Sequence, residues 1–315
     1  MRAALVQQYG PPDVVRVADV SAPTPGRDEV LVRVRAAAVT VADARIRGSR
    51  FPRGFRLLAR LALGVRRPRR PILGGVYSGV VEQVGPDVTT LSRGDEVAGM
   101  TGTRMGTHAE LVVVPADRAV PKPDGVSHED AAAVLFGGTT ALHYLTRRAE
   151  VGPGTSVLVV GASGAVGTAV VQLAAHRGAT VTGVASAANL DLVRRLGAHH
   201  VVDYRTTPVQ ELTGRYDVVV DVVGALSTRA GRRLLTDDGV LLLITGTFGQ
   251  SLTSVGRVRS GPAPEKPQDV AELLRLVAEG ALTPVTESVV GLDDVAASHA
   301  RIDTGHKVGN IVLTP

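Results

Sequence analysis

Two kinds of hydrophobic spacing divide this chain. In the first third, apolar and polar residues alternate over short stretches, as in Glu29-Val-Leu-Val-Arg-Val-Arg35. Similar stretches run over 78–85 and 109–115, and glycine or proline pairs interrupt them. Strict alternation is typical of strands with one buried face, so this part of the chain is predicted to be β-rich.

The pattern changes near Ser127. A serine with acids in the next turn and Asp130 three residues on predicts a helix start with a capping box. Short apolar runs then alternate with helical segments, the runs being 156–161, 180–185, 200–203, 217–223 and 240–245. This alternation indicates βαβ units and a parallel sheet.

The end of the chain returns to mixed structure. A loop rich in glycine, proline and arginine is predicted after Gly249. Helices are predicted over 268–279 and 292–304, and a last strand over 310–314.

Composition favours a globular protein without a membrane span. The chain has 315 residues, 44% hydrophobic and 21% charged, and no apolar run approaches the roughly 18 residues that a span needs. The apolar stretch in the first ten residues is too short for a secretory signal. The chain has no cysteine, which rules out disulfides, thiolate metal sites and a cysteine nucleophile. We therefore expect a cytoplasmic protein.

The net charge of +5 has a local origin. The segment 50–71 holds eight arginines and no acid, so removing their eight charges from +5 leaves −3 for the rest. Aromatic residues are only 3% of the chain, which leaves few stacking platforms for nucleic acid. We expect no nucleic-acid partner. The segment itself has two interpretations, an amphipathic helix on a membrane surface or a solvated loop covering a cleft.

A glycine-rich turn marks the strongest candidate site. It reads Val157-Leu-Val-Val-Gly-Ala-Ser-Gly-Ala-Val-Gly167 and lies between a predicted strand and a predicted helix, 164–177. Gly161 permits a tight turn, Gly164 lets the backbone approach a diphosphate, and Gly167 allows close helix packing. The free amides of the helix start would bind the phosphates. The cofactor-binding turn is thus Gly161, Ser163, Gly164, Ala165, Val166 and Gly167.

The second strand of this region favours NADPH over NADH. NAD sites place an acid at the end of that strand to bind the ribose 2′-hydroxyl. Here Ser186 and Asn189 follow it, and no acid precedes Asp191. These two polar residues could donate hydrogen bonds to a 2′-phosphate, and Arg194 or Arg205 could supply charge. The alternative is that 186–190 is an ordinary polar loop.

Blocks along the whole chain resemble the medium-chain dehydrogenase/reductase superfamily, in its zinc-independent quinone oxidoreductase-like branch. The blocks include Gly94-Asp-Glu-Val97, Gly106-Thr-His-Ala-Glu110, Tyr216-Asp-Val-Val-Val-Asp-Val-Val-Gly224 and Gly305-His-Lys-Val-Gly-Asn-Ile-Val-Leu313. The resemblance implies an α/β fold, with a GroES-like β-rich catalytic domain and a Rossmann domain built on a doubly wound parallel sheet. Residues 1–125 and 266–315 would form the first, and 126–265 the second. It also implies a homodimer.

The resemblance assigns further site residues. Thr40, Asp43 and Thr140 match positions that line the nicotinamide end, and are the candidate catalytic residues. For Asp43 the equal alternative is an N-cap of the turn 44–47, and for Thr140 an ordinary helical residue. Positions that approach the cofactor elsewhere are Tyr204, Arg205, Val223, Gly224, Gly246, Lys307 and Asn310. His108 is expected to be a hydrogen-bonded structural histidine.

The residues required for zinc-dependent catalysis and for the short-chain dehydrogenase mechanism are missing from the sequence. Where zinc-bearing relatives carry Gly-His-Glu, this chain reads Gly74-Gly75-Val76, and it has no cysteine, so we expect no metal. The tyrosine and lysine pair of short-chain dehydrogenases, four residues apart, is absent from all three lysine positions. Metal-free hydride transfer to a conjugated acceptor remains, because conjugation spreads the developing charge.

Two functional hypotheses follow. In the first, the protein transfers hydride from NADPH to a quinone or an α,β-unsaturated carbonyl compound. In the second, it binds NADPH without catalysis, as a sensor or partner-docking protein. Thr40 and Val76, at positions where the branch usually has other residues, and the arginine-rich segment motivate the second hypothesis.

Overall fold

The computed structural model describes residues 1–51, 56–245 and 256–315. The chain divides into two compact units. In the described residues, the first unit comprises Met1–Phe51, Arg56–Phe136 and Glu265–Pro315, and the second comprises Gly137–Pro264. Helix α3 (His128–His143) contains the boundary between them. We propose that these units are the two expected domains.

The first unit is built around a seven-stranded sheet. Its order is β14-β15-β3-β4-β5-β7, and β6 also pairs with β3. The strands of this unit are β1 (Arg2–Val6), β2 (Val15–Asp19), β3 (Glu29–Val39), β4 (Val76–Val84), β5 (Glu96–Met100), β6 (Leu111–Pro115), β7 (Val120–Pro121), β14 (Thr286–Gly291) and β15 (Asn310–Thr314). The predicted strands over 29–35, 78–85, 109–115 and 310–314 are confirmed, whereas β1, β2, β5, β7 and β14 were not predicted.

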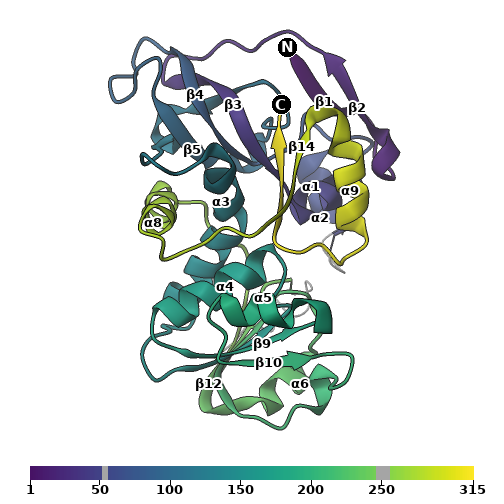
Figure 1. Ribbon diagram of the computed structural model, residues 1–315. Coiled ribbons are helices and arrows are strands. Elements are labelled where there is room, and N and C mark those ends of the chain that lie inside the picture. The colour runs from purple at the N-terminus through teal and green to yellow at the C-terminus, as the bar shows by residue number, and fades with distance from the viewer. Residues whose placement is uncertain (52–55, 246–255) are drawn as a thin grey trace. The chain divides into compact units, whose positions relative to one another are not determined.

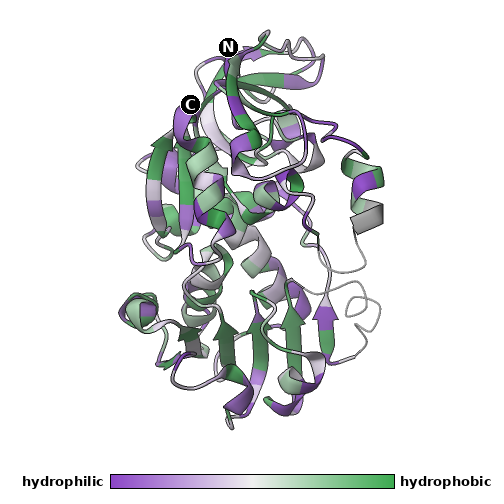
Figure 2. Ribbon diagram, turned by 90° about the vertical axis from the view of Figure 1, so that its right-hand side faces the viewer, coloured by the Kyte–Doolittle hydropathy of each residue, from purple (hydrophilic) through white to green (hydrophobic). Residues whose placement is uncertain are grey.

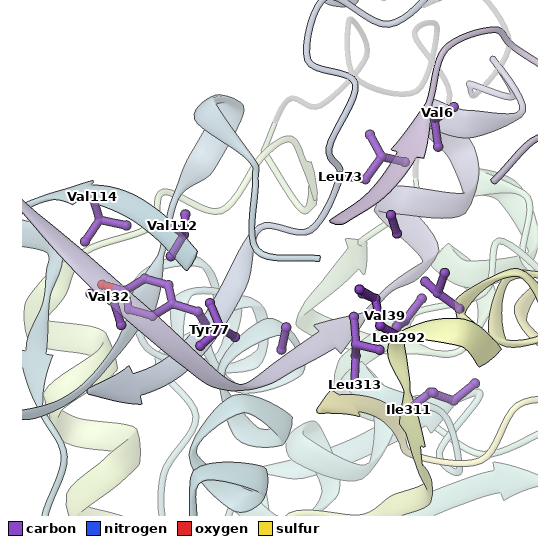
Figure 3. Packing of buried hydrophobic residues seen from close by; sticks show 14 of the residues in the cluster. Val6, Val32, Val39, Leu73, Tyr77, Val112, Val114, Leu292, Ile311 and Leu313 are labelled. Atoms are coloured by element: carbon purple, nitrogen blue, oxygen red, sulfur yellow. The ribbon is translucent and has the colours of Figure 1, made fainter. Parts of the chain in front are cut away.

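Long strand β3 holds this unit together because it pairs with three others. It runs antiparallel to β4, β6 and β15. Figure 3 shows the side chains that fill the space beside it, among them Val32, Tyr77 and Val114, all fully buried. Val30, Val32 and Val34 lie in the core as the alternation predicts, but Leu31 and residues 36–39 are buried too, so β3 does not keep one face in solvent along its whole length.

Helices of the first unit come from three separate parts of the chain. They are α1 (Val41–Arg47), α2 (Arg56–Leu63), α8 (Pro267–Ala278) and α9 (Val295–Asp303), and α1 packs against α9 (Figure 1). The predicted helices over 268–279 and 292–304 are confirmed, the second beginning with a 3₁₀ turn at Leu292–Asp294. Helix α3 starts as predicted, with Ser127 and Asp130 exchanging capping hydrogen bonds of 2.8 and 3.0 Å.

The second unit is a parallel sheet of six strands in the order β10-β9-β8-β11-β12-β13. The strands are β8 (Ser156–Val160), β9 (Thr180–Ala185), β10 (His200–Asp203), β11 (Tyr216–Asp221), β12 (Leu235–Leu243) and β13 (Val258–Ser260). All neighbours in this sheet are parallel. The loop predicted after Gly249 was wrong in one part, because β13 lies there and extends the sheet by main-chain pairing with β12.

Strand order in the second unit reverses beside β8, the first strand of this unit. Helices α4 (Ala165–His176) and α5 (Leu190–Arg195) lie over one face of the sheet, and α6 (Thr228–Arg233) lies over the other (Figure 1). The strands are hydrophobic along most of their length (Figure 2) because both faces are covered. The parallel sheet predicted from the apolar runs is confirmed, and it is doubly wound as the family resemblance implied. Ligands bind such sheets at the carboxyl ends of the strands, where the order reverses.

Candidate functional site

Gly161 and Gly167 shape the turn between β8 and α4. The φ angle of Gly161 is +87°, and a Cβ there would lie 2.5 Å from Val223 Cγ1. A Cβ on Gly167 would lie 2.1 Å from the carbonyl oxygen of Gly161. Real Cβ contacts are never this short, so both positions require glycine for the turn to close.

Gly164 has a different environment. It caps α4 with φ −81°, and the nearest atom to an added Cβ would be Gly161 O at 3.8 Å. No side chain in the described part of the protein caps this helix. The first amides of α4 lack intrahelical acceptors by geometry, and an added Cβ on Gly164 would have only one neighbouring atom within 4 Å. We propose that this helix start, named the anion cradle below, is where a dinucleotide diphosphate would bind.

Three of the predicted polar residues meet beside the turn. The side-chain amide of Asn189 donates to Ser163 Oγ at 3.3 Å and to Ser186 Oγ at 3.2 Å. Ser163 belongs to the glycine turn, and the other two follow β9. The end of β9 is therefore tied to the anion cradle through hydroxyl and amide groups, with no carboxylate among them.

Tyr204 and Arg205 follow the next strand, β10. The amide of Tyr204 donates to Ala185 O at 3.2 Å, which places it beside the end of β9. The Arg205 guanidinium lies over the Tyr204 ring, 6.0 Å from its centroid. Arg194 instead pairs with Asp191 at 2.8 Å, so Arg205 is the better placed of the two arginines to supply charge.

Asp221, which the sequence analysis did not single out, positions the loop after β11. It is fully buried, and its Oδ1 accepts the amides of Val223 and Gly224 at 3.0 and 2.8 Å. Its Oδ2 accepts the amide of Leu226 at 2.7 Å. An acid at the end of an otherwise apolar run was the available signal, because a buried carboxylate needs such donors.

Gly137 in α3 was also missed. A Cβ on Gly137 would lie 2.2 Å from the carbonyl oxygen of Ala165, so α3 passes very close to the first turn of α4. Thr140 follows three residues later and is half-buried. The pair Gly137-Gly138 inside a helical segment was the signal, since glycine in a helix interior is costly without a packing reason.

In the first unit, Thr40 and Asp43 form a capping box at the start of α1. The hydroxyl and amide of Thr40 donate to Asp43 Oδ2 at 2.6 and 2.8 Å, and the amide of Asp43 donates to Thr40 Oγ1 at 3.3 Å. Asp43 Oδ1 also accepts the amide of Gly74 at 2.9 Å. The N-cap is Thr40, so the alternative that placed Asp43 at that position was wrong, because the helix begins three residues earlier than expected.

Lys307 and Asn310 lie at the start of β15. The Lys307 ammonium donates to Gly309 O. Burial is the main cause that lowers the pKa of Lys307 to about 8. The charge of Glu287 raises this pKa and that of Arg301 lowers it, both by less than burial does. The side chain of Asn310 donates to Val285 O at 3.0 Å. Because β15 and β3 are antiparallel and Ile311 pairs with Val39, Asn310 at the start of β15 lies beside Thr40, which follows the end of β3.

The structure thus gathers most predicted residues within each unit. In the second unit they follow the carboxyl ends of four adjacent strands, β10, β9, β8 and β11. Thr40, Asp43, Lys307 and Asn310 belong to the first unit. Gly246 lies outside the described residues. His108 is buried, with its Nε2 3.2 Å from Ala38 O, as expected of a structural histidine.

Two absences concern only the described parts of the chain. Residues 1–51, 56–245 and 256–315 contain no group of three or more His, Asp or Glu side chains arranged to hold a metal ion. Among their helices, none combines the length and the apolar character that crossing a bilayer would require.

Comparisons with known proteins agree with this arrangement. Residues 26–124 match the family described as alcohol dehydrogenase GroES-like domain, and 196–313 match the family described as zinc-binding dehydrogenase. A quinone oxidoreductase of Pseudomonas aeruginosa is 31% identical over 98% of this chain and 97% of its own. The chloroplastic NADPH-dependent alkenal/one oxidoreductase of Arabidopsis thaliana is 29% identical over 100% of this chain and 80% of its own. The solved quinone oxidoreductase of Coxiella burnetii is 28% identical, with a TM-score of 0.89 over 100% and 99% of the two chains.

Proposed function

Because the chain belongs to the medium-chain dehydrogenase/reductase superfamily, in its quinone oxidoreductase-like branch, we propose that it is an NADPH-dependent reductase of quinones or α,β-unsaturated carbonyl compounds. The observation that carries the proposal is the uncapped start of α4 with open space at Gly164. Two relatives named for reduction of these acceptors cover nearly the whole chain.

NADPH would supply the hydride when bound. The amides of Ala165, Val166 and Gly167 would hold its diphosphate, and the loop fixed by Asp221 would bring Val223 and Gly224 toward the ring. Ser186, Asn189 and Arg205 would bind the 2′-phosphate. No carboxylate follows β9 before Asp191, and that acid already pairs with Arg194, so repulsion of a phosphate there is small.

We propose that water supplies the proton to the reduced acceptor. The Thr40 hydroxyl donates its proton to Asp43, so in this arrangement it offers a substrate only its lone pairs. Thr140, near the start of α4, is the second hydroxyl proposed to face the reacting groups. The residues would then mainly orient two planar molecules against each other, which suits a conjugated acceptor.

We propose that the reaction needs no zinc, although one matching family is described as zinc-binding. The chain has no cysteine, and Gly74-Gly75-Val76 offers no ligand side chains. Dialysis against a chelator should therefore leave turnover unchanged, and elemental analysis should find far less than one zinc per chain. Loss of activity that added zinc restores would refute this part.

The enzyme assay follows NADPH absorbance with a panel of quinones and enones. Turnover above the buffer rate is expected with at least one acceptor. The Gly164→Ala variant should bind NADPH at least tenfold more weakly, because its methyl group enters the diphosphate space. Gly152→Ala is the matched control, since a Cβ there meets nothing within 4 Å. Tight binding without any turnover would instead favour the non-catalytic hypothesis.

Two further expectations come from the family. We propose that the protein is a cytoplasmic homodimer, which light scattering during size-exclusion chromatography would test for the oligomeric state. A single species at the mass of one chain, 32.7 kDa, would exclude the dimer at the concentration used.

A further inference from the structure

The segment after α2 carries charge that the fold does not use. Arg66, Arg67, Arg69 and Arg70 are exposed, and the described residues give none of them an ion pair. The residues outside the described ranges, 52–55 and 246–255, contain no Asp or Glu. No acid occurs in the sequence between Asp43 and Glu82, so local neutralisation is absent as well.

Other arginines of the same stretch do have structural partners. Arg47 and Arg50 pair with Asp303. Arg60 lies 5.1 Å over the Tyr9 ring and donates to Ser49 Oγ at 3.1 Å. The fold therefore separates this arginine-rich stretch into an anchored part and a free part of four arginines.

Exposed apolar side chains accompany the four free arginines. Leu61 on α2 is 53% exposed and Val65 is 57% exposed, whereas Leu63 between them packs against the core. An exposed leucine and valine next to four cations is the composition of an interfacial segment, in which apolar side chains enter the headgroup region and cations contact phosphates.

The segment is held in place by several backbone contacts. The Tyr9 hydroxyl donates to Gly64 O at 2.5 Å, and the amide of Arg69 donates to Leu63 O at 2.7 Å. At its end, the amide of Val6 donates to Pro71 O at 2.7 Å. The four arginines and Val65 therefore lie on a turn held by backbone hydrogen bonds, and Leu61 lies on the helix just before it, so little ordering entropy opposes binding.

We propose that Leu61, Val65 and the four arginines Arg66, Arg67, Arg69 and Arg70 form a docking surface for a bilayer of anionic phospholipids. Charge complementarity selects the anionic surface, and the two apolar side chains favour a bilayer over nucleic acid, which offers them no apolar phase. This surface does not depend on the proposed reductase activity. A protein held there would meet lipophilic molecules at the membrane where they partition.

The test is cosedimentation of the full-length protein with vesicles of phosphatidylcholine containing phosphatidylglycerol, and with vesicles of phosphatidylcholine alone. Binding is expected only to the anionic vesicles and should weaken with salt. Replacing all four arginines by serine should weaken it on the order of several hundredfold, since each cation near such a surface contributes about fivefold. Thermal unfolding should change little, because the described residues give none of the four an ion pair.

Two matched variants make the test specific. The quadruple variant Arg16→Ser, Arg93→Ser, Arg195→Ser and Arg229→Ser removes the same charge from exposed arginines without described ion pairs, and should bind nearly as the parent protein does. The double variant Leu61→Ser and Val65→Ser keeps the charge and should bind about tenfold more weakly. The proposal is overturned if the protein ignores anionic vesicles, if both quadruple variants lose binding equally, if the double variant binds like the parent, or if a DNA duplex outcompetes the vesicles.

Discussion

At the scale of single residues, Asp43 shows how a candidate catalytic side chain can be needed by the fold. Its two oxygens accept three donors, from the amide and hydroxyl of Thr40 and the amide of Gly74. Replacing it by alanine would leave these buried donors unsatisfied, at about 1–3 kcal/mol each. We expect Asp43→Ala to lower the free energy of unfolding by roughly 3–5 kcal/mol in urea titrations.

The matched control variant is Asp43→Asn, whose side chain keeps one acceptor oxygen and replaces the other by an NH₂ group. It should cost less than the alanine variant, about 1–2 kcal/mol. If Asp43→Ala unfolds at the same urea concentration as the parent protein yet reduces turnover strongly, the capping box contributes little and the residue acts mainly in catalysis. Measuring both stability and turnover therefore distinguishes the catalytic role expected from the family resemblance from the structural role expected from the hydrogen bonds.

A second prediction concerns His299 and the loss of folding stability at acidic pH. It is fully buried in α9 with neither ring nitrogen hydrogen-bonded among the described residues. Its pKa is lowered to about 4, mainly by burial and then by the charges of His108 and Arg47, while Asp43 and Asp303 oppose the change. The unfolded chain takes up this proton near the ordinary value of about 6.5. Stability from the neutral ring is therefore complete above that pH and is lost as the pH falls toward 4.

We expect the parent protein to lose up to about 3 kcal/mol from this residue between those two pH values. The variant His299→Leu, whose side chain cannot titrate, should show a shallower fall in unfolding free energy over the same range. His176→Leu, at an exposed position on α4, is the control for removing a histidine. Equal slopes for the parent and His299→Leu would contradict the prediction.

At the scale of elements, the glycine turn was predictable because its residues answer to local geometry. Gly161 and Gly167 are excluded from carrying a side chain by contacts within one βα unit. The apolar runs likewise predicted β8, β9, β10 and β11, since strands covered on both faces leave an uninterrupted hydrophobic signal. Two short strands at the sheet edges were not predicted. Strand β14 alternates weakly and is largely half-exposed, and β13 has only three residues.

The contacts that the sequence could not predict join distant elements. Gly137 meets Ala165 only because α3 crosses the start of α4, and Asp43 meets Gly74 across 31 positions. Nothing in the spacing of either segment specifies the partner. The pairing of Arg47 with Asp303 is of the same kind, since 256 positions separate them.

Gly167 allows a prediction at the element scale. The variant Gly167→Ala must push α4 away from the turn, because its Cβ would lie 2.1 Å from Gly161 O and 2.8 Å from the Ala162 Cα. We expect a loss of unfolding free energy of about 2–4 kcal/mol, together with weaker NADPH binding. Gly164→Ala should keep the parent's stability within about 1 kcal/mol and lose only binding. Equal stability of both variants would show that the turn relaxes without cost.

At the scale of the whole molecule, the predicted cofactor residues are divided between two units. The anion cradle and the polar residues after β9 and β10 belong to the second unit, whereas Thr40, Asp43, Lys307 and Asn310 belong to the first. Each group is compact within its own unit. Their joint action on one cofactor is an expectation from the family resemblance, and it can be measured without knowing the substrate.

Amide hydrogen exchange with and without NADPH provides that measurement. Saturating NADPH, at a hundred times its Kd, should stabilise the folded protein by about 2.7 kcal/mol. Within the second unit, protection should rise at the amides of 163–168 and 186–189, which adjoin the cradle. Within the first unit, it should rise at 40–44 and 307–310, while the strand centre near Val32 stays as slow as before. Protection confined to the second unit would remove Thr40, Asp43, Lys307 and Asn310 from the cofactor site and leave the cradle of α4 as the whole of it.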